Sequence, residues 1–441
     1  MKKILIIGTL IAALIGSSSM GLYAQEVWSL SMCIRQALKN NSDIKRQQVQ
    51  VDKQAIQVQT VKYSRLPNLT AGSTQKFDFG RSLNRGNTYD DTNSHTTAIS
   101  LTTEVPIFTG FRISNLTAQH KLELKSYTED LEKRENDIAL QVAIYYYQIL
   151  LNREIFTIAS EQVLLSQELE KITQVLVEHG KVPESQLLEV QAEISNDELR
   201  VVHAQNNLRL SMIDLIQLME LNQPEDFDII PVGADSVLLL PNQPNDIFKI
   251  ASRTMPEIKG ASYLVESRER AVKVAESGYY PTLSLQAGIN SGYYHFSNAD
   301  NSSINNQLKN NLQKTIYLTL RIPLFNRMST RNAVRIAQKD LEDSQLIVEN
   351  TQKNLLKEIQ KAYYDAISAR EKFISTQKAI AFNNEALRYA QEKYYAGKST
   401  AYEFNETKMK LTNSLSEQAQ AKYEFMLQQY LLDFYTGGSI K

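Results

Sequence analysis

Turn-forming residues are scarce in this sequence. Its 441 residues include 10 prolines and 16 glycines, whereas average usage of about 5% and 7% would give roughly twice as many of each. Turns must therefore be few, and the helices and strands between them long. Hydrophobic residues make up 42% of the chain and charged residues 22%, a balance typical of a folded protein rather than a disordered one.

The sequence has only one cysteine, and it has no excess of basic residues and no cluster of reactive residues. The single cysteine, Cys33, excludes an intrachain disulfide and a thiolate metal cluster. Lys and Arg number 48 against 49 Asp and Glu, so we expect no nucleic-acid partner, because such binding needs basic residues in excess. The five histidines are scattered without an H-E-x-x-H pair, and no P-loop or G-x-S-x-G motif is present. We therefore predict no catalytic residues, no metal site and no cofactor.

The first residues have the features of an export signal. Lys2 and Lys3 precede an apolar run at residues 4–15, and Ala24 is a small residue before a polar one. This pattern predicts a signal peptide at 1–24 and an exported mature chain. An uncleaved inner-membrane anchor is the alternative, for which the apolar run is short. Elsewhere the sequence has no run of 18 apolar residues, so we expect no membrane-spanning helix.

The sequence repeats itself. Val105-Pro106-Ile107-Phe108 recurs as Ile322-Pro323-Leu324-Phe325, at a spacing of 217 residues (322 − 105). Other landmarks keep this spacing, or one of 214: Tyr146-Tyr147 with Tyr363-Tyr364, Gly180-Lys181 with Gly397-Lys398, and Leu66-Pro67 with Tyr280-Pro281. Such internal similarity predicts a tandem repeat. Beyond the signal peptide we expect a first repeat at 25–221, a linker at 222–246, a second repeat at 247–436 and a tail at 437–441.

Each repeat contains one very long stretch without turn residues. Residues 111–179 and 324–396 contain neither Gly nor Pro, and as helices at about 1.5 Å per residue each would span roughly 100–110 Å. Gly180 and Gly397 end these stretches. Helices are predicted to resume at 184–221 and 398–436. In the first of these, one apolar position recurs every seven residues, which predicts left-handed supercoiling against a neighbour: Leu187, Ile194, Val201, Leu208 and Leu215.

The segments before the long helices alternate between apolar and polar residues instead. Leu283, Leu285, Ala287 and Ile289 show this alternation, as do Ile316, Leu318, Leu320 and Ile322. We predict β-hairpins at 68–105 and 281–322, whose strands are joined by polar loops at 80–95 and 294–313. Strands of about 9–11 residues with one apolar and one polar face are typical of a transmembrane β-barrel with a wet interior. A half-buried sheet in a soluble α+β protein is the alternative.

Four strands are too few to close a membrane barrel, for which about eight is the minimum. An open sheet edge in lipid would leave unpaired backbone groups at a cost of several kcal/mol each. Several chains must therefore pool their strands, and three chains would supply twelve. The polar face would then line the barrel lumen, with four candidate lining residues: Thr102, Glu104, Tyr317 and Arg321.

The order of these features resembles the outer-membrane efflux channel (TolC) family. The resemblance rests on the Leu66-Pro67 and Pro281 strand entries, the Val105-Pro106-Ile107-Phe108-Thr109-Gly110 exit, the long helices, and the Gly180 and Gly397 breaks. It covers nearly the whole mature chain. It implies an α+β membrane protein that forms a homotrimer, with a 12-strand outer-membrane β-barrel continued by a periplasmic α-helical coiled-coil tunnel. The second exit departs from the family, because Phe325-Asn326-Arg327 replaces small residues or Gly.

The segment after Gly397 carries two acids, Glu403 and Glu406, on one helical face. Thr400 and Glu403 have the spacing of a capping box, and both acids would complement the positive helix N-terminus. In the family the corresponding positions are acidic and line the constricted periplasmic mouth. The resemblance therefore implies a pore gate made of Glu403, Glu406 and the neutral first-repeat match Gln186. Capping and gating both remain open for these residues.

The resemblance implies a passive exit duct in the outer membrane, in contact with its lipid, and not an enzyme. An inner-membrane transporter would drive export through a periplasmic adaptor. The adaptor would dock at the helical hairpin tips, at Gly180, Lys181, Gly397, Lys398 and Ser399. Two alternatives remain: a periplasmic coiled-coil scaffold or adaptor with a small soluble β-sheet, and an exported enzyme on a helical scaffold, for which the sequence lacks a reactive cluster.

Overall fold

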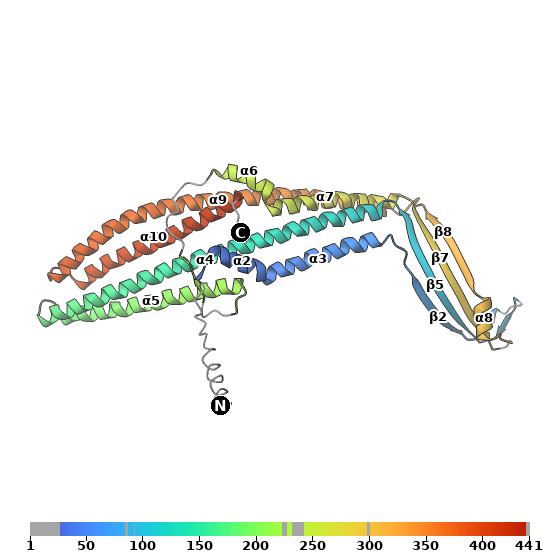
Figure 1. Cartoon of the computed structure of the whole chain (residues 1–441), viewed down its shortest axis with the longest axis horizontal. Coiled ribbons are helices and arrows are strands. Elements are labelled where there is room, and N and C mark those ends of the chain that lie inside the picture. Colours follow the sequence, from blue (N-terminus) through green and yellow to red (C-terminus); the bar gives the residue numbers. More distant parts are fainter. Residues whose placement is uncertain are drawn as a thin grey trace, which may run out of the picture. The chain divides into compact units, whose positions relative to one another are not determined.

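The computed structural model describes residues 27–83, 87–91, 93–222, 227–231, 242–297 and 300–437. The predicted signal peptide at 1–24, much of the linker at 222–246 and nearly all of the tail at 437–441 lie outside these residues. The described chain forms two units (Figure 1). The described residues of the helical unit lie within Met1–Lys45, Arg134–Ala251 and Leu356–Lys441, and those of the sheet unit within Arg46–Lys133 and Ser252–Leu355.

Two helical hairpins make up most of the helical unit. Helix α4 (Arg112–Glu178) and helix α9 (Ser329–Tyr395) each have 67 residues, and helix α5 (Glu184–Leu218) and helix α10 (Ala401–Tyr435) each have 35. Figure 1 shows α5 returning along α4 and α10 returning along α9. These helices lie within the predicted stretches, where neither Gly nor Pro interrupts the hydrogen-bond ladder. Shorter helices accompany them: α2 (Leu30–Asn40) and α6 (Pro244–Thr254).

Part of the predicted linker is ordered against α4. Strand β6 (Asp228–Ile229) pairs in parallel with β1 (Val27–Trp28). The Tyr146 hydroxyl donates hydrogen bonds to the carbonyls of Ile230 (2.6 Å) and Trp28 (3.2 Å). Arg153 forms an ion pair with Asp228. The same α4 helix thus holds both short strands, and α6 begins before the predicted end of the linker.

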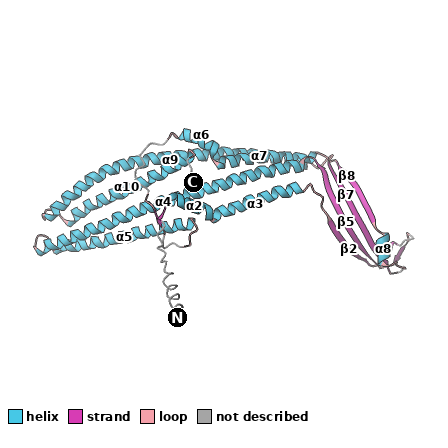
Figure 2. Ribbon diagram, in the orientation of Figure 1, coloured by secondary structure: helices cyan, strands magenta, loops and turns pink. Residues whose placement is uncertain are grey.

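The sheet unit contains one four-stranded antiparallel sheet of order β2-β5-β7-β8 (Figure 2). Its strands are β2 (Thr70–Asp78), β5 (Ser94–Thr109), β7 (Thr282–Phe296) and β8 (Gln313–Arg321). Helix α3 (Ser42–Tyr63) precedes the first pair, and helix α7 (Pro256–Glu276) with a 3-10 turn (Ser277–Tyr279) precedes the second. No helix in the described residues is both long and apolar enough to cross a membrane.

Three details of the predicted hairpins are wrong. Strand β5 does not end at residue 105 but continues to Thr109, because a bulge between Pro106 and Phe108 accommodates the missing proline N–H. The predicted loop at 80–95 contains a small hairpin of β3 (Arg81–Leu83) and β4 (Tyr89–Asp91). The predicted loop at 294–313 contains helix α8 (Ile304–Asn310), whose N-cap Ser303 accepts a hydrogen bond from the Asn306 N–H.

The sheet has one polar and one apolar face. Directly opposite residues of antiparallel strands share a face, and Glu104, Gln286 and Tyr317 form one such row on β5, β7 and β8. The Tyr317 hydroxyl donates a hydrogen bond to Gln286. The adjacent row on the other face is Val105, Leu285 and Leu318. The register places all four predicted lumen residues on the polar face: Thr102 opposite Gly288, Glu104 opposite Gln286, Tyr317 opposite Gln286 and Arg321 opposite Thr282.

The exits from the two hairpins have the same backbone conformation in spite of their different sequences. Gly110 and Phe111 have φ of 62° and 66°, and Arg327 and Met328 have φ of 54° and 66°. A Cβ on Gly110 would lie 2.7 Å from the Ser277 carbonyl oxygen, so the first exit requires glycine. At the second exit Arg327 adopts the left-handed conformation in place of glycine.

Candidate functional site

The tips of the two helical hairpins are built alike. Gly180 and Gly397 have φ of 65° and 68°, and a Cβ added to either would meet open space. The next N–H closes each helix: Lys181 donates to the Leu176 carbonyl and Lys398 to the Lys393 carbonyl, both at 2.9 Å. This pattern is a Schellman motif, whose left-handed residue favours glycine for its backbone alone. Glycine therefore ends α4 and α9, and it leaves the tip residues Lys181 and Lys398 exposed.

The start of α10 forms only half of the predicted capping box. The Thr400 hydroxyl accepts a hydrogen bond from the Glu403 N–H (3.3 Å), as predicted. The Glu403 carboxylate does not reach back to the Thr400 N–H, and instead accepts a hydrogen bond from the Ser399 hydroxyl (2.7 Å). This part of the prediction is wrong, because Ser399 offers a nearer donor. The Glu403 carboxylate stays exposed and tied to the tip.

The two acids lie on the exposed side of α10. Glu406 forms an ion pair with Lys410 (2.7 Å), and both side chains are more than half exposed. Ala401, Phe404 and Lys408 on the same helix are at most 1% exposed. At about 100° per residue these three point to the side opposite Glu403 and Glu406.

Gln186, the third predicted gate residue, has a different setting. It lies in the first turn of α5, whose N-cap Pro183 provides no side-chain hydrogen bond. The Gln186 side chain is partly buried, and its Oε1 atom is shielded from solvent without a hydrogen-bond partner in the described residues. Glu403 and Glu406 therefore share one exposed face of α10. The side-chain oxygen of Gln186 is not exposed in this way.

An apolar core joins the two hairpins behind the tips. It includes Leu176 of α4, Val190 of α5, Tyr394 of α9 and Phe404 of α10. The rings of Tyr394 and Phe404 lie 6.1 Å apart. Burial raises the pKa of the Tyr394 hydroxyl, which therefore stays protonated and able to donate a hydrogen bond.

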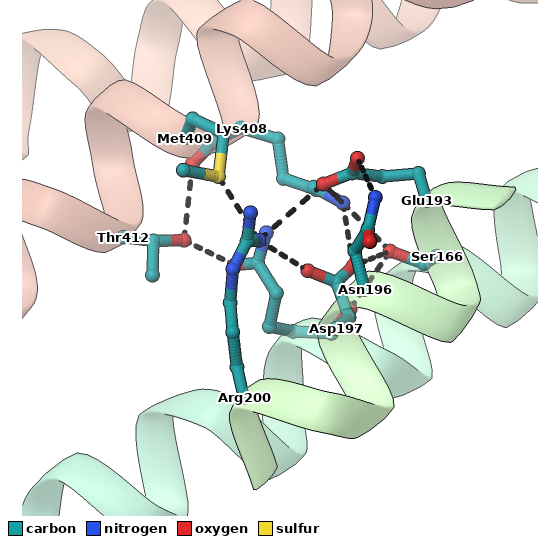
Figure 3. Close-up of polar contacts among 9 residues, drawn as sticks. Ser166, Glu193, Asn196, Asp197, Arg200, Lys408, Met409 and Thr412 are labelled. Atoms are coloured by element: carbon teal, nitrogen blue, oxygen red, sulfur yellow. Dashed lines mark hydrogen bonds and ion pairs between the residues drawn. The ribbon is translucent and has the colours of Figure 1, made fainter. Parts of the chain in front are cut away.

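A buried polar cluster lies on the same side of α10 as this core (Figure 3). We call Ser166, Asp197 and Lys408 the buried triad; they come from α4, α5 and α10 and are 0%, 0% and 1% exposed. The Lys408 Nζ atom lies 2.8 Å from Asp197 Oδ2 and 2.7 Å from Ser166 Oγ. The Ser166 hydroxyl donates to Asp197 Oδ2 at 2.6 Å. Each member of the triad thus contacts both others.

Further polar side chains complete the cluster. Arg200 donates to the second oxygen of Asp197, Oδ1, at 2.6 Å, and to Glu193 Oε1 at 3.3 Å. Glu193 Oε1 also lies 3.9 Å from Lys408 Nζ. The buried charges of Lys408 and Asp197 therefore balance each other, as a buried ion pair requires, and the exposed Arg200 and partly buried Glu193 form a second pair beside them. One turn further along α10, Thr412 donates a hydrogen bond to Gln162 of α4.

The buried triad was not predicted from the sequence, although a signal for it exists. Val190, Asp197, Ala204 and Ser211 recur every seven residues and are all buried. This series runs beside the predicted apolar one on α5, so Asp197 is a charged residue at a position of the helix seam. A polar residue at such a position typically specifies helix register, at a cost in stability.

Other reactive groups of the described residues lie apart from these sites. No group of three or more His, Cys, Asp or Glu in them could hold a metal ion. Cys33 is buried, and burial raises its pKa to about 12, so the thiol is unreactive near neutral pH. His95 and His295 stack across β5 and β7 with ring centroids 4.6 Å apart.

The chain is similar to known proteins over nearly all of its length. Residues 33–220 and 250–438 match the family described as outer membrane efflux protein. Toxin and drug export protein A of Aggregatibacter actinomycetemcomitans is 23% identical over 397 residues, which cover 89% of this chain and 83% of that protein. Outer membrane protein TolC of Escherichia coli is 21% identical over 439 residues, 97% of this chain and 85% of that protein. The crystal structure of CusC, described as forming a transmembrane channel, has the same fold, with a TM-score of 0.79, 18% identity, and coverage of 93% of this chain and 92% of that one.

Proposed function

Because this chain belongs to the outer membrane efflux protein family, we propose that three copies pool their sheets into one closed barrel of twelve strands in the outer membrane. The resemblance found in the sequence is confirmed, and with it the outer-membrane location and the role as an exit duct. The family consists of transport proteins, and we propose that this chain too is a passive duct without a catalytic step. We propose that sheets and helices of three chains together build that duct.

The unpaired edges of the four-stranded sheet are the main support for a shared barrel. Strands β2 and β8 each have one edge without a partner in the four-stranded order, and each has nine residues. In lipid these unpaired N–H and C=O groups would cost several kcal/mol each. Pairing β8 of one protomer with β2 of the next satisfies both edges, and three such joints close the barrel.

The faces of the sheet support its place in lipid. The apolar face includes Leu318 and Leu320, which are 59% and 60% exposed in a single chain. Aromatic contacts flank this face: Phe77 with His95 at one end, and Phe108 with Phe111 at the other. The twelve residue-to-residue steps along β7 from Leu283 to His295 measure about 40 Å, and a tilt of about 45° reduces this to roughly 28 Å. This height suits a band of about 25 Å between aromatic girdles. Thr102, Glu104, Tyr317 and Arg321 would then face the lumen.

The helices supply a second contact between protomers. Helix α5 has a stripe of apolar side chains, each at least 50% exposed in a single chain: Leu188, Leu199, Val202, Leu210 and Ile213. At about 100° per residue the stripe lies on the side of α5 opposite the buried seam, and its members recur at helical spacing. We propose that a helix of the neighbouring protomer covers it and continues the barrel as a helical tunnel.

The tips form the periplasmic mouth of this proposed tunnel. Glu403 and Glu406 point away from the apolar core, and three copies would place six carboxylates around the mouth. Lys410 would partly neutralise each Glu406. Gln186 would add a neutral side chain from the first repeat. The tip residues Gly180, Lys181, Gly397, Lys398 and Ser399 would receive a periplasmic adaptor, which would connect the duct to an inner-membrane transporter.

We also propose that the chain is a duplication, with repeats at 25–221 and 247–436. The family matches it twice, at 33–220 and 250–438. The long helices have equal lengths in the two halves, and both tips have the same Schellman motif. The hairpin exits at Gly110 and Arg327 also have matching backbone angles.

Mass measurement in detergent, combined with carbonate extraction of membranes, tests the assembly. We expect a trimer that resists carbonate and high salt and dissociates on boiling with loss of the β-signal. A periplasmic scaffold with a soluble sheet would be released by carbonate. A monomer that keeps its β-signal in detergent would contradict the shared barrel.

A further inference from the structure

We propose that the buried triad of Ser166, Asp197 and Lys408 sets the rotation and height of α10 against α4 and α5, and thereby the direction of Glu403 and Glu406. The triad residues are positioning residues, because they do not reach the mouth themselves. The inference rests on the proposed function in one respect, namely that the two acids line the mouth.

The triad and the acids lie on opposite sides of one rigid helix. Lys408 follows Phe404 by one turn and points to the same side, whereas Glu403 and Glu406 point roughly the opposite way at about 100° per residue. Any rotation of α10 at Lys408 therefore turns the acids by the same angle. With side chains about 5–6 Å from the helix axis, a rotation of 20° moves each carboxylate by roughly 2 Å. Three protomers would apply this shift to a narrow opening at once.

Apolar packing alone would fix this angle poorly. Phe404 is the large buried apolar side chain next to Lys408 on this side of α10, and it lies one turn nearer the tip. The positions seven residues before and after Lys408 hold only the small Ala401 and the half-buried Leu415. Hydrophobic contact is non-directional, so a small rotation or slide of α10 would bury a similar apolar area. Hydrogen bonds and ion pairs are directional and tolerate only a narrow range of distance and angle.

The buried triad supplies directional contacts that fix the rotation of α10. Lys408 Nζ contacts a carboxylate of α5 and a hydroxyl of α4 within 2.8 Å. Arg200 holds the other oxygen of Asp197 and thus fixes the carboxylate plane. A displaced α10 would leave Lys408 buried without its partners and would take from Asp197 its one buried counter-charge, which is strongly unfavourable. One arrangement of the three helices therefore satisfies all of these charges.

The test removes both buried charges together. In Asp197→Leu/Lys408→Met no unpaired charge remains, so the seam can stay packed. The matched control, Gln162→Leu/Thr412→Val, removes a neutral hydrogen bond between α4 and α10 one turn away and leaves the triad intact. Should the first variant fail to assemble, the substitute variant is Asp197→Asn/Lys408→Met. Its Asn oxygen can still accept from Arg200, and its amide nitrogen can donate to Ser166 Oγ.

Two readouts separate the triad from the gate. Spin labels at Tyr402→Cys on α10 and Glu189→Cys on α5, in trimers diluted with unlabelled chains and lacking Cys33, report the distance between the helices. Single-channel recordings report the mouth. We expect the charge-free variant to form trimers with a broadened or shifted distance distribution and several conductance levels, while the control keeps the narrow distribution and single level of the wild type.

An unchanged distance distribution in trimers of the charge-free variant would overturn the positioning role, whatever the conductance. A broadened distribution with unchanged conductance and ion preference would support that role, and would instead overturn the placement of Glu403 and Glu406 at the mouth. A control variant that broadened the distribution equally would also overturn the proposal, because any lost hydrogen bond would then have the same effect.

Discussion

Thr173 on α4 and Tyr394 on α9 share a fully buried hydrogen bond of 2.7 Å, although they are 221 residues apart in the sequence. The bond connects the two hairpins a few residues behind their tips. Thr173 also donates to the Leu169 carbonyl within its own helix. The Tyr394 hydroxyl thus depends on Thr173 of the other hairpin for its hydrogen bond.

Removal of the Tyr394 hydroxyl should weaken the contact between the hairpins. We expect Tyr394→Phe to lower the free energy of unfolding by about 0.5–1.5 kcal/mol, since the ring still packs and only one hydrogen bond is lost. Denaturant unfolding in detergent, followed by helical circular dichroism, measures this change. The control Tyr395→Phe, at a more exposed hydroxyl of the same helix, should change stability by less than about 0.5 kcal/mol. Equal effects would contradict the buried link.

Cys33 should resist thiol reagents in the folded protein. Burial raises its pKa from 9.0 to about 12, so almost no thiolate exists at pH 8, and only unfolding should allow reaction with a disulfide reagent. The raised pKa means that the folded chain keeps a proton that the unfolded chain loses above about pH 9. Folding stability should therefore decrease between about pH 9 and 12. Rapid labelling at pH 8 without denaturant would contradict the buried position.

Two of the left-handed glycines, Gly110 and Gly397, should differ in their tolerance of alanine. Gly397→Ala should cost about 1–2 kcal/mol, because its Cβ meets open space and only the backbone conformation is strained. Gly110→Ala should cost more, because its Cβ would lie 2.7 Å from the Ser277 carbonyl oxygen and 2.8 Å from the Tyr280 Cβ. Unfolding free energies of the two variants, with Gly397→Asn as a milder replacement, test this order.

The two faces of β8 should respond oppositely to a charge. We expect Leu318→Arg to face lipid and cost roughly 2–4 kcal/mol near the midplane, and the adjacent Thr319→Arg to face water and be tolerated. The yield of heat-dissociable trimer in outer membranes compares the two. Equal or reversed yields would mean that the assigned faces are wrong, since neighbouring residues of a strand point to opposite sides.

Charge at the proposed mouth should set ion preference. Glu403→Gln/Glu406→Gln should reduce cation preference and weaken block by trivalent cations added on the periplasmic side. Lys410→Gln should do the opposite, because it frees the Glu406 carboxylate from its ion pair. Single-channel recordings with Glu371→Gln as a remote control measure both effects. If the acids act only in capping, selectivity should stay constant and stability should fall by about 0.5–2 kcal/mol.

The elements that depend on local chemistry could be predicted from the residues alone. Helix α4 runs from Arg112 to Glu178, because this stretch contains no proline that would remove a backbone hydrogen bond and no glycine that would favour a left-handed turn. The alternation along β8 fixed which residues share a face, because side chains alternate along any strand. The N-cap at Thr400 followed from its side chain alone. Each of these depends on residues only a few positions apart.

Contacts between distant residues, in contrast, depend on how the helices and strands pack. The sheet order places β5 beside β7, which no local pattern specifies. The Glu403 carboxylate bonds to Ser399 instead of closing the capping box, because the fold of the tip decides between two nearby donors. The sequence shows a charge at Asp197 on a helix seam, but the partner that makes its burial tolerable, Lys408, lies 211 residues further along. A buried charge constrains where a partner must be in space and not where it must be in the chain, so its identity emerges only when the helices are packed.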